Sequence, residues 1–306
     1  MNLLALLIGL AVERLATRLF HLRELRWLDR IIDWGFHQTE KHTNWPALIP
    51  VVLLVLLLVL PLFIILWGLR DTLWGFTHLL LSVVVLFFSL GPKDIGEEVD
   101  DYCEALESED EDAIVRTAKA LVESDIPDDP LERTHKVEEA VCVQANNRLF
   151  AVIFWFILTG PLGALGAWTY RVTDLVRRRA VFKAMRSEED ATSAGKVRDA
   201  SIALHGLLAW IPARLTAVGY ATAGHFDEAI SALRTPGDEP ETTTHEHSDR
   251  LLARVGTAAL ALQDRPDESI TERGVRGARA ANSLVFRLLV IWAVLISAMT
   301  LYGLTQ

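Results

Sequence analysis

The chain has 306 residues, of which 51% are hydrophobic and 23% are charged, and its formal net charge is −10. Its mean hydropathy of +0.26 is high for a chain with an ordinary share of charged residues, so apolar and charged residues must be segregated into blocks. This pattern is typical of membrane spans joined by aqueous loops. Two cysteines are too few for a disulfide scaffold, and a negative chain without a basic stripe is not a general nucleic-acid binder.

Four stretches are expected to cross the bilayer as helices. Residues 47–69, 72–92 and 284–304 carry no charge apart from Arg287, and about 20 such residues are enough to cross the hydrocarbon. Because only two residues separate the first two stretches, we expect a tight antiparallel hairpin. Residues 1–20 are interpreted as an uncleaved first span, because they lack a small-residue cleavage site followed by a polar start.

Two further apolar segments differ from plain spans. Leu149–Tyr170 contains Gly-Pro-Leu-Gly-Ala-Leu-Gly at residues 160–166, where helix propensity is low. Ile202–Ala223 carries Pro212 and Arg214 at the depth where a plain span would face lipid. We therefore expect both to be broken, re-entrant or interfacial. The expected fold class is an all-α polytopic membrane protein with about four full transmembrane helices, two such segments and cytoplasmic helical loops.

The distribution of basic residues favours this arrangement over six plain spans. Eight Lys and Arg residues fall between Arg171 and Arg198, and five fall between Arg18 and Lys41. With four spans both groups lie on the cytoplasmic side, as the positive-inside rule requires. With six spans, which is the alternative, the two groups lie on opposite sides.

On this basis the sequence divides into five parts. They are the N-terminal membrane helices (1–92), an acidic helical cytoplasmic loop (93–148), the broken segments with a basic loop (149–223), a polar helical loop (224–283) and the C-terminal span (284–306). The acidic loop holds 18 acidic and 6 basic residues between Gly91 and Arg148, so its surface is either a docking face for a protein partner or simply solvated. Ser108-x-x-Glu111 predicts a capping box before an amphipathic helix in this loop.

The sequence contains no standard catalytic, nucleotide-binding or zinc signature, and we expect neither a metal site nor a cofactor. Ionisable residues at membrane depth are therefore the first functional candidates, and these are Glu13, Arg14 and Arg214. Their structural alternatives are an internal ion pair for Glu13 with Arg14, and snorkelling to the headgroups for Arg214.

The break in the second half of the chain is the other candidate. A broken membrane helix presents free N–H groups and a positive dipole end, which favour anions. We expect a cytoplasm-facing pocket for a phosphate or carboxylate group, formed by Gly160, Gly163, Tyr170, Arg171, Asp174 and Arg214. The alternative is that the glycines only permit close helix packing.

The membrane segments also carry a specific string of motifs: Phe154-Trp155, Gly160-Pro161-x-Gly163-Ala164, Tyr170-Arg171 and Leu208-x-Trp210-Ile211-Pro212-Ala213-Arg214-Leu215-Thr216. These motifs resemble the membrane superfamily of adenosylcobinamide-phosphate synthases and AmpE proteins. At the other end, Glu13-Arg14-Leu15 and Trp27-Leu28-Asp29 are similar to the start of AmpE, and the Asp-Pro and His-Pro pattern of the synthases is missing. The resemblance covers essentially the whole chain.

A departure from the synthases indicates the AmpE branch. Before the Phe-Trp pair the synthases carry a Glu-x-x-x-Glu-Asn-x-x-Asp run, and the aligned residues here are Glu139, Val143, Gln144 and Asn147. Only Glu139 keeps its carboxylate, so most of the groups that would hold magnesium or accept a proton are gone. The resemblance therefore implies a regulatory protein rather than an enzyme.

AmpE proteins are inner-membrane proteins of Gram-negative bacteria associated with β-lactamase induction and with the recycling of cell-wall fragments. The resemblance thus implies a multi-pass modulator in the inner membrane, embedded in the lipid bilayer. We expect it to bind an anionic small molecule or cell-wall fragment, with Glu139 among the ligand-binding residues. The alternatives are an ATP-dependent amide-forming ligase, as the synthases are, and a transporter.

Overall fold

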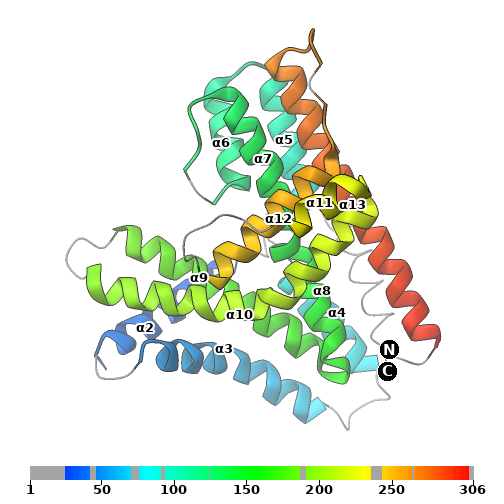
Figure 1. Cartoon of the computed structure of the whole chain (residues 1–306). Coiled ribbons are helices and arrows are strands. Elements are labelled where there is room, and N and C mark those ends of the chain that lie inside the picture. Colours follow the sequence, from blue (N-terminus) through cyan, green and yellow to red (C-terminus); the bar gives the residue numbers. More distant parts are fainter. Residues whose placement is uncertain are drawn as a thin grey trace.

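A computed structural model describes residues 25–41, 46–69, 76–90, 94–123, 125–186, 191–235, 243–263 and 265–302, and every regular element in these ranges is helical (Figure 1). The elements are α2 (Arg26–Lys41), α3 (Leu48–Leu69), α4 (Phe76–Ser89), α5 (Ile95–Glu107), α6 (Glu111–Leu121), α7 (Pro130–Ala145), the π-helix η2 (Asn146–Phe150), α8 (Ala151–Leu158), the 3₁₀ turn η3 (Gly160–Leu162), α9 (Gly163–Arg186), α10 (Ala191–Ala223), α11 (Phe226–Arg234), α12 (Thr244–Leu260) and α13 (Ile270–Leu301). The predicted all-α polytopic class is confirmed.

The helices that can cross a membrane differ in part from the expected ones. Four segments of the described chain are long and apolar enough: Leu48–Gly68, Pro130–Leu158, Ser193–Ala223 and Ile270–Leu301. The expected spans at 47–69 and 284–304 are among them. The expected span at 72–92 appears as the 14-residue helix α4, and the expected span at 1–20 lies outside the described residues.

The expectation that Ile202–Ala223 is broken is wrong. It belongs to α10, a single helix of 33 residues that continues through Pro212. A proline leaves the carbonyl of the residue four positions earlier without its helical donor, and here that residue is Leu208. The indole Nε1–H of Trp155 donates to the Leu208 carbonyl at 3.1 Å, which satisfies the freed oxygen and keeps the helix intact.

The break in the other segment is confirmed. α8 ends at Leu158, η3 follows, and α9 starts at Gly163. Gly160 has φ +55°, a left-handed conformation that favours glycine. A Cβ on Gly163 would lie 2.6 Å from the Phe156 carbonyl oxygen, so this glycine also allows α8 and α9 to approach closely.

The acidic loop folds into α5, α6 and α7, seen at the top of Figure 1, and packs against the first half of α13. The helix that follows Ser108 is present, but its predicted cap is wrong. Ser108 instead ends α5, and Asp110 caps α6 by accepting from the backbone N–H of Ala113 at 3.2 Å. The apolar core of this lobe is continuous with α10 and α12.

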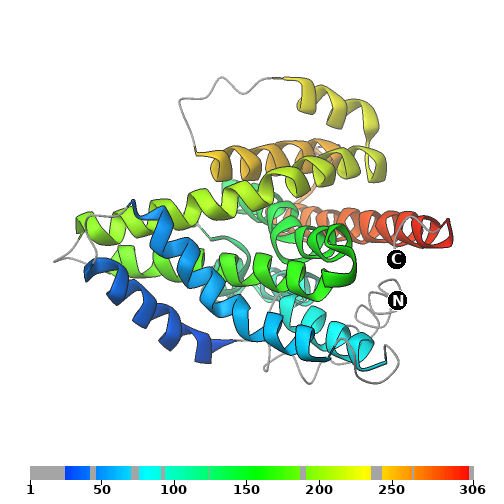
Figure 2. The same ribbon diagram turned by 90° about the horizontal axis from the view of Figure 1, so that it is seen from below.

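The apolar surface lies on a different part of the molecule. Exposed large hydrophobic side chains line α3, the second half of α10 and the second half of α13, including Leu56, Ile64, Leu207, Leu215, Val290 and Val294. Apolar surface of this extent fits a lipid environment. α10 lies between α9 and α12 and contacts both (Figure 2). Its exposed apolar half is thus connected through α12 to the polar part of the chain.

Candidate ligand-binding site

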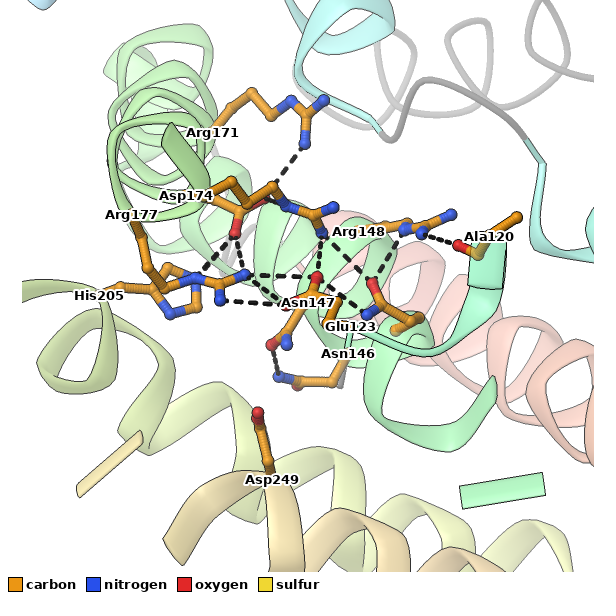
Figure 3. A network of polar contacts seen from close by, with 12 residues as sticks. Ala120, Glu123, Asn146, Asn147, Arg148, Arg171, Asp174, Arg177, His205 and Asp249 are labelled. Carbon is orange, nitrogen blue, oxygen red and sulfur yellow. Dashed lines mark hydrogen bonds and ion pairs between the residues drawn. The ribbon is translucent and has the colours of Figure 1, made fainter. Parts of the chain in front are cut away.

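One face of α9 carries four ionisable residues at helical spacing: Arg171, Asp174, Arg177 and Arg178. Asp174 is fully buried at the centre of this face. Its carboxylate accepts from Arg171 Nη1 at 3.3 Å, Arg177 Nη2 at 2.8 Å and Arg178 Nε at 2.9 Å (Figure 3). The sequence places these residues on one helix, and burial of that face turns them into an ion-pair network.

The acidic loop supplies a second carboxylate, Glu123, from the segment between α6 and α7. Glu123 accepts from Arg177 Nη1 at 3.0 Å, and Arg178 Nη2 forms an ion pair with it at 2.8 Å. The amide Nε2–H of Gln144 on α7 donates to the same carboxylate at 3.0 Å. We call the group Glu123, Gln144, Asp174, Arg177 and Arg178 the arginine cluster.

The arginines decide the charge state of both carboxylates. Burial alone would raise the pKa of Asp174, but Arg178 and Arg177 beside it hold that pKa well below its usual range. The same two guanidinium groups outweigh burial at Glu123 and lower its pKa. Both carboxylates are therefore ionised, and the cluster is a set of opposite charges rather than a proton-sharing pair.

A further arginine ties the cluster to the rest of the acidic lobe. Arg148 is buried, and its Nη1 donates to Glu98 of α5 at 2.7 Å. Its Nε donates to the Gln144 side-chain oxygen at 2.9 Å, and its Nη2 donates to the Ala120 carbonyl at 3.3 Å. Glu123 of the acidic loop thus pairs with Arg177 and Arg178 of α9, and Glu98 pairs with Arg148 within the loop, which explains part of that loop's charge.

The π-helix η2 directs two asparagines toward the same region. Thr216 Oγ1 on α10 donates to Asn146 Oδ1 at 3.0 Å, and the Tyr170 hydroxyl donates to Asn147 Oδ1 at 3.5 Å. A π-turn inside an α-helix shifts the side chains after it and often occurs at functional sites. Here it brings the amides of neighbouring residues into contact with two different helices.

Two histidines and Asp249 complete the surroundings of the cluster. His205 Nε2 lies 3.7 Å from Asp174 Oδ1, and its ring centroid lies 5.0 Å from that of His245. His245 Nδ1 lies 3.7 Å from Asp249 Oδ1, and Asp249 points from α12 toward the asparagines (Figure 3). Among the residues that the structure describes, no group of three or more His, Cys, Asp or Glu is arranged to hold a metal ion.

Burial is the largest influence on the pKa values of Asp249 and His245, which both lie on α12. It raises the pKa of Asp249 to about 7, against the smaller lowering effect of Arg177. It also lowers the pKa of His245 to about 4, and Arg177 acts in the same direction. Asp249 therefore titrates near neutral pH, whereas His245 is neutral there.

A cavity of about 630 Å³ opens between α7 and α12, with the cluster along one side. Its walls carry both signs of charge together with small apolar residues: Leu121, Val122, Glu123, Lys136, Glu139, Ala140, Val143, Gln144, Asp249, Arg250, Ala253, Arg254 and Thr257. This volume is in the range of small-molecule sites. The cavity can hold an organic ligand and offers it charged partners from α7, α12 and the segment after α6.

The structure brings together some of the site residues proposed from the sequence. Tyr170, Arg171 and Asp174 lie in or beside the cluster. Glu139 lies on the cavity wall, where Lys136 Nζ is 3.2 Å from its carboxylate.

The other proposed residues lie elsewhere. Gly160 and Gly163 form the break, and Gly163 precedes Tyr170 by about 10 Å along the helix axis. Arg214 is partly exposed, and it donates to the Trp210 carbonyl at 3.0 Å while its guanidinium carbon lies 3.9 Å from the Trp210 ring centroid. Glu13 and Arg14 lie outside the described residues.

Sequence reasoning did not single out several residues of the site. Arg177 and Arg178 counted only as part of a topology signal, and Gln144 only as the residue aligned with the asparagine of the synthase run. His205, an imidazole in an apolar stretch, is a signal that would have been available. Glu123 and Asp249 have no distinguishing local pattern, because their roles depend on residues far away in the chain.

Comparisons with known proteins identify the family of the chain. A family model described as "Regulatory signalling modulator protein AmpE" matches residues 1–305. Protein AmpE of Shigella flexneri is 25% identical over 298 residues, which cover 94% of this chain and 94% of that protein.

Two proteins named "Cobalamin biosynthesis protein CobD" are similar over a shorter range. The one from Stutzerimonas stutzeri (strain A1501) is 29% identical over 180 residues, which are 58% of this chain and 55% of that protein. The one from Chromobacterium violaceum is 24% identical over 182 residues, 59% of this chain and 54% of that protein. The match thus spans about half the length of these CobD proteins. No solved structure matches the chain.

Proposed function

The chain belongs to the AmpE family of regulatory signalling modulator proteins, and from this premise we propose that it modulates β-lactamase induction from the bacterial inner membrane. In this proposal it responds to an anionic small molecule, such as a cell-wall fragment released during exposure to a β-lactam antibiotic. The apolar helices hold the protein in the bilayer, and the acidic lobe carries the ligand site.

The observation that carries the proposal is the cavity beside the arginine cluster. The cavity touches Glu123 and Gln144, and through them it reaches Arg177 and Arg178 of α9. Its remaining wall comes from α7 and α12, which contact α13 and α10 respectively. A ligand bound there would contact the acidic lobe and α12 directly, and it would reach α13 and α10 only through α7 and α12.

The other candidate residues receive supporting roles in this proposal. Asp174 holds the arginines of the cluster, Arg171 donates to Asp174, and the Tyr170 hydroxyl donates to Asn147. The break at Gly160 sets the start of α9 and thereby its direction. Glu139 contributes a wall of the cavity.

The test measures β-lactamase induction by a cell-wall antibiotic in a strain that lacks the gene. Complementation with the wild-type gene should restore the normal response, and complementation with Ala253→Trp should not. Ala253 lines the cavity, and an indole there would fill much of its volume. Ala184→Trp, at a half-buried alanine of α9 outside the cavity, is the matched control and should restore the response. A deletion strain with an unchanged response would refute the proposal.

The similarity to the CobD proteins favours one second candidate, an ATP-dependent amide-forming ligase. Glu139 lines the cavity, but the two other positions that are acidic in the synthases hold Val143 and Asn147 here. The gene should therefore fail to rescue growth of a synthase-deficient strain on cobinamide. Rescue would favour the ligase over the regulator.

A further inference from the structure

Glu123 occupies a site that other elements of the protein build. It follows Val122, the last capping residue of α6, and lies outside the helices. The groups that bind it come from α7 and α9: Gln144 Nε2, Arg178 Nη2 and both terminal nitrogens of Arg177, at 2.8 to 3.4 Å. Five contacts from two helices therefore converge on one loop carboxylate. We call these donor groups the carboxylate site.

Groups other than Glu123 also hold the donors in place. Asp174 accepts from Arg177 Nε at 3.2 Å and from Arg178 Nε at 2.9 Å, so it holds both guanidinium groups from the buried side. The Gln144 oxygen accepts from Arg148 Nε at 2.9 Å and from Arg178 Nη2 at 3.3 Å. This fixes the amide so that its N–H₂ end faces the carboxylate site. Such a preformed set of donors binds anions without reorganisation.

Glu123 lies on the side of the carboxylate site that faces the cavity, and the arginines lie behind it. The side chain of Arg177 is 5% exposed and that of Asp174 is 1% exposed, whereas that of Glu123 is 36% exposed. Glu123 also lines the cavity of about 630 Å³, which has room for the rest of a ligand. An incoming anion therefore meets Glu123 first and the arginines directly behind it.

From this arrangement we infer that the carboxylate site binds the carboxylate group of a small-molecule ligand, and that Glu123 occupies the site when the ligand is absent. This inference deepens the proposed function, on which it rests for the existence of a regulatory ligand. It names the ligand group and the side chain that the ligand displaces.

The ligand group follows from the geometry and the charge. Arg177 binds both oxygens of Glu123 in the forked arrangement that is typical of guanidinium and carboxylate groups. Removing the anion beside the buried Arg177 and the half-buried Arg178 would be costly, but exchanging one carboxylate for another keeps them neutralised. Displacement also releases Glu123, and with it the contact between the segment after α6 and α9.

The experiment is chemical rescue of Glu123→Ala by acetate. Thermal unfolding of the purified full-length protein in detergent is followed while sodium acetate replaces sodium chloride at constant ionic strength. Acetate should raise the midpoint of Glu123→Ala, with an apparent dissociation constant at least about tenfold lower than for the wild type, in which the glutamate competes. Glu111→Ala is the matched control, because Glu111 of α6 pairs with Arg133 and is 64% exposed, away from the cavity.

Each outcome decides the inference. Equal effects of acetate on Glu123→Ala and Glu111→Ala would overturn it, and a stronger effect of sodium phosphate than of acetate would overturn the carboxylate class. If Glu123→Ala does not stay folded in chloride, the fraction recovered as monodisperse protein after extraction in acetate is compared with that in chloride, and no difference refutes the site. Because no antibiotic response is measured, failure of the proposed function leaves this result unaffected.

Discussion

Two arginines on neighbouring long helices, Arg177 on α9 and Arg214 on α10, have different surroundings. The side chain of Arg177 is 5% exposed and binds the carboxylates of Asp174 and Glu123. Arg214 is partly exposed, donates to a backbone carbonyl of its own helix and stacks on the Trp210 ring. Arg214 is the more conspicuous in the sequence, since it interrupts an apolar stretch.

This difference shows that the role of an arginine next to apolar segments depends on the groups that it contacts, and not on its place in the sequence. A buried guanidinium needs a carboxylate, because desolvation of an unpaired charge is costly. A guanidinium near the surface is satisfied by a carbonyl and an aromatic face, which together contribute little. We therefore propose ligand binding beside the arginine cluster rather than at Arg214.

The largest expected effect on stability comes from removing Arg177, and removal of Arg214 serves as the comparison. Arg177→Ala leaves Asp174 buried without its closest partner, so we expect a loss of about 3–5 kcal/mol in the free energy of unfolding. Arg214→Ala removes a cation–π contact and should cost about 1 kcal/mol or less. Denaturant unfolding of both purified variants in detergent measures the two losses. Equal losses would mean that the two arginines have equivalent structural roles.

The next largest losses of stability are expected at the two glycines of the break between α8 and α9. Gly163→Ala brings a methyl group against the Phe156 carbonyl oxygen at 2.6 Å, and we expect a loss of roughly 1–3 kcal/mol. Gly160→Ala meets no neighbour within 4 Å, and its only cost is the left-handed φ of +55°, about 1 kcal/mol. Thermal unfolding of the two variants tests this order. A larger loss at Gly160 would show that backbone conformation, not close packing, determines the break.

The pH dependence of stability compares two groups beside the arginine cluster, Asp249 and His245. The pKa of Asp249 is raised to about 7 by burial, so the folded state holds its proton more tightly, and its contribution to stability falls as pH rises from about 4 to 7. The pKa of His245 is lowered to about 4 by burial, so its contribution rises over about pH 4 to 6.5. The two dependences oppose each other in the wild type.

Asp249→Asn removes only the first of these dependences. The stability of the variant relative to the wild type should therefore increase with pH between about 4 and 7 and level off above 7. Unfolding at a series of pH values measures this difference. A difference that does not change with pH would show that Asp249 has an ordinary pKa in the folded protein.

The substitution with the smallest expected effect on the protein tests on which side of the membrane the arginine cluster lies. Arg178 is unsuitable for cysteine labelling because it belongs to the cluster, but Met185 at the end of α9 is 76% exposed. Met185→Cys should not react with an impermeant thiol reagent in intact cells and should react after permeabilisation. Reaction in intact cells would place this end of α9 outside and remove the cytoplasmic ligand site.

Sequence patterns predicted the helical elements well where the signal is local. The apolar run at 47–69, the helix after Ser108 and the break at Gly160 are all present. The prediction failed at Pro212, because the indole that satisfies the freed carbonyl comes from Trp155, 53 residues away from Leu208. A proline has a fixed local cost, but whether it breaks a helix depends on its neighbours in space.

The sequence by itself determined the helical class, the membrane character and the family resemblance, because composition, helical periodicity and motif spacing are properties of consecutive residues. Only the tertiary structure decided which charges meet. Glu123 and Arg177 are 54 residues apart, and Glu98 and Arg148 are 50 apart. Glu123 meets Arg177 where the segment after α6 reaches α9, whereas Glu98 meets Arg148 within the acidic loop. In the described part of the chain, burial makes an unpaired charge costly and selects the arrangement in which each buried arginine has a carboxylate. The candidate site is thus a product of packing, and local sequence contributes only its separate parts.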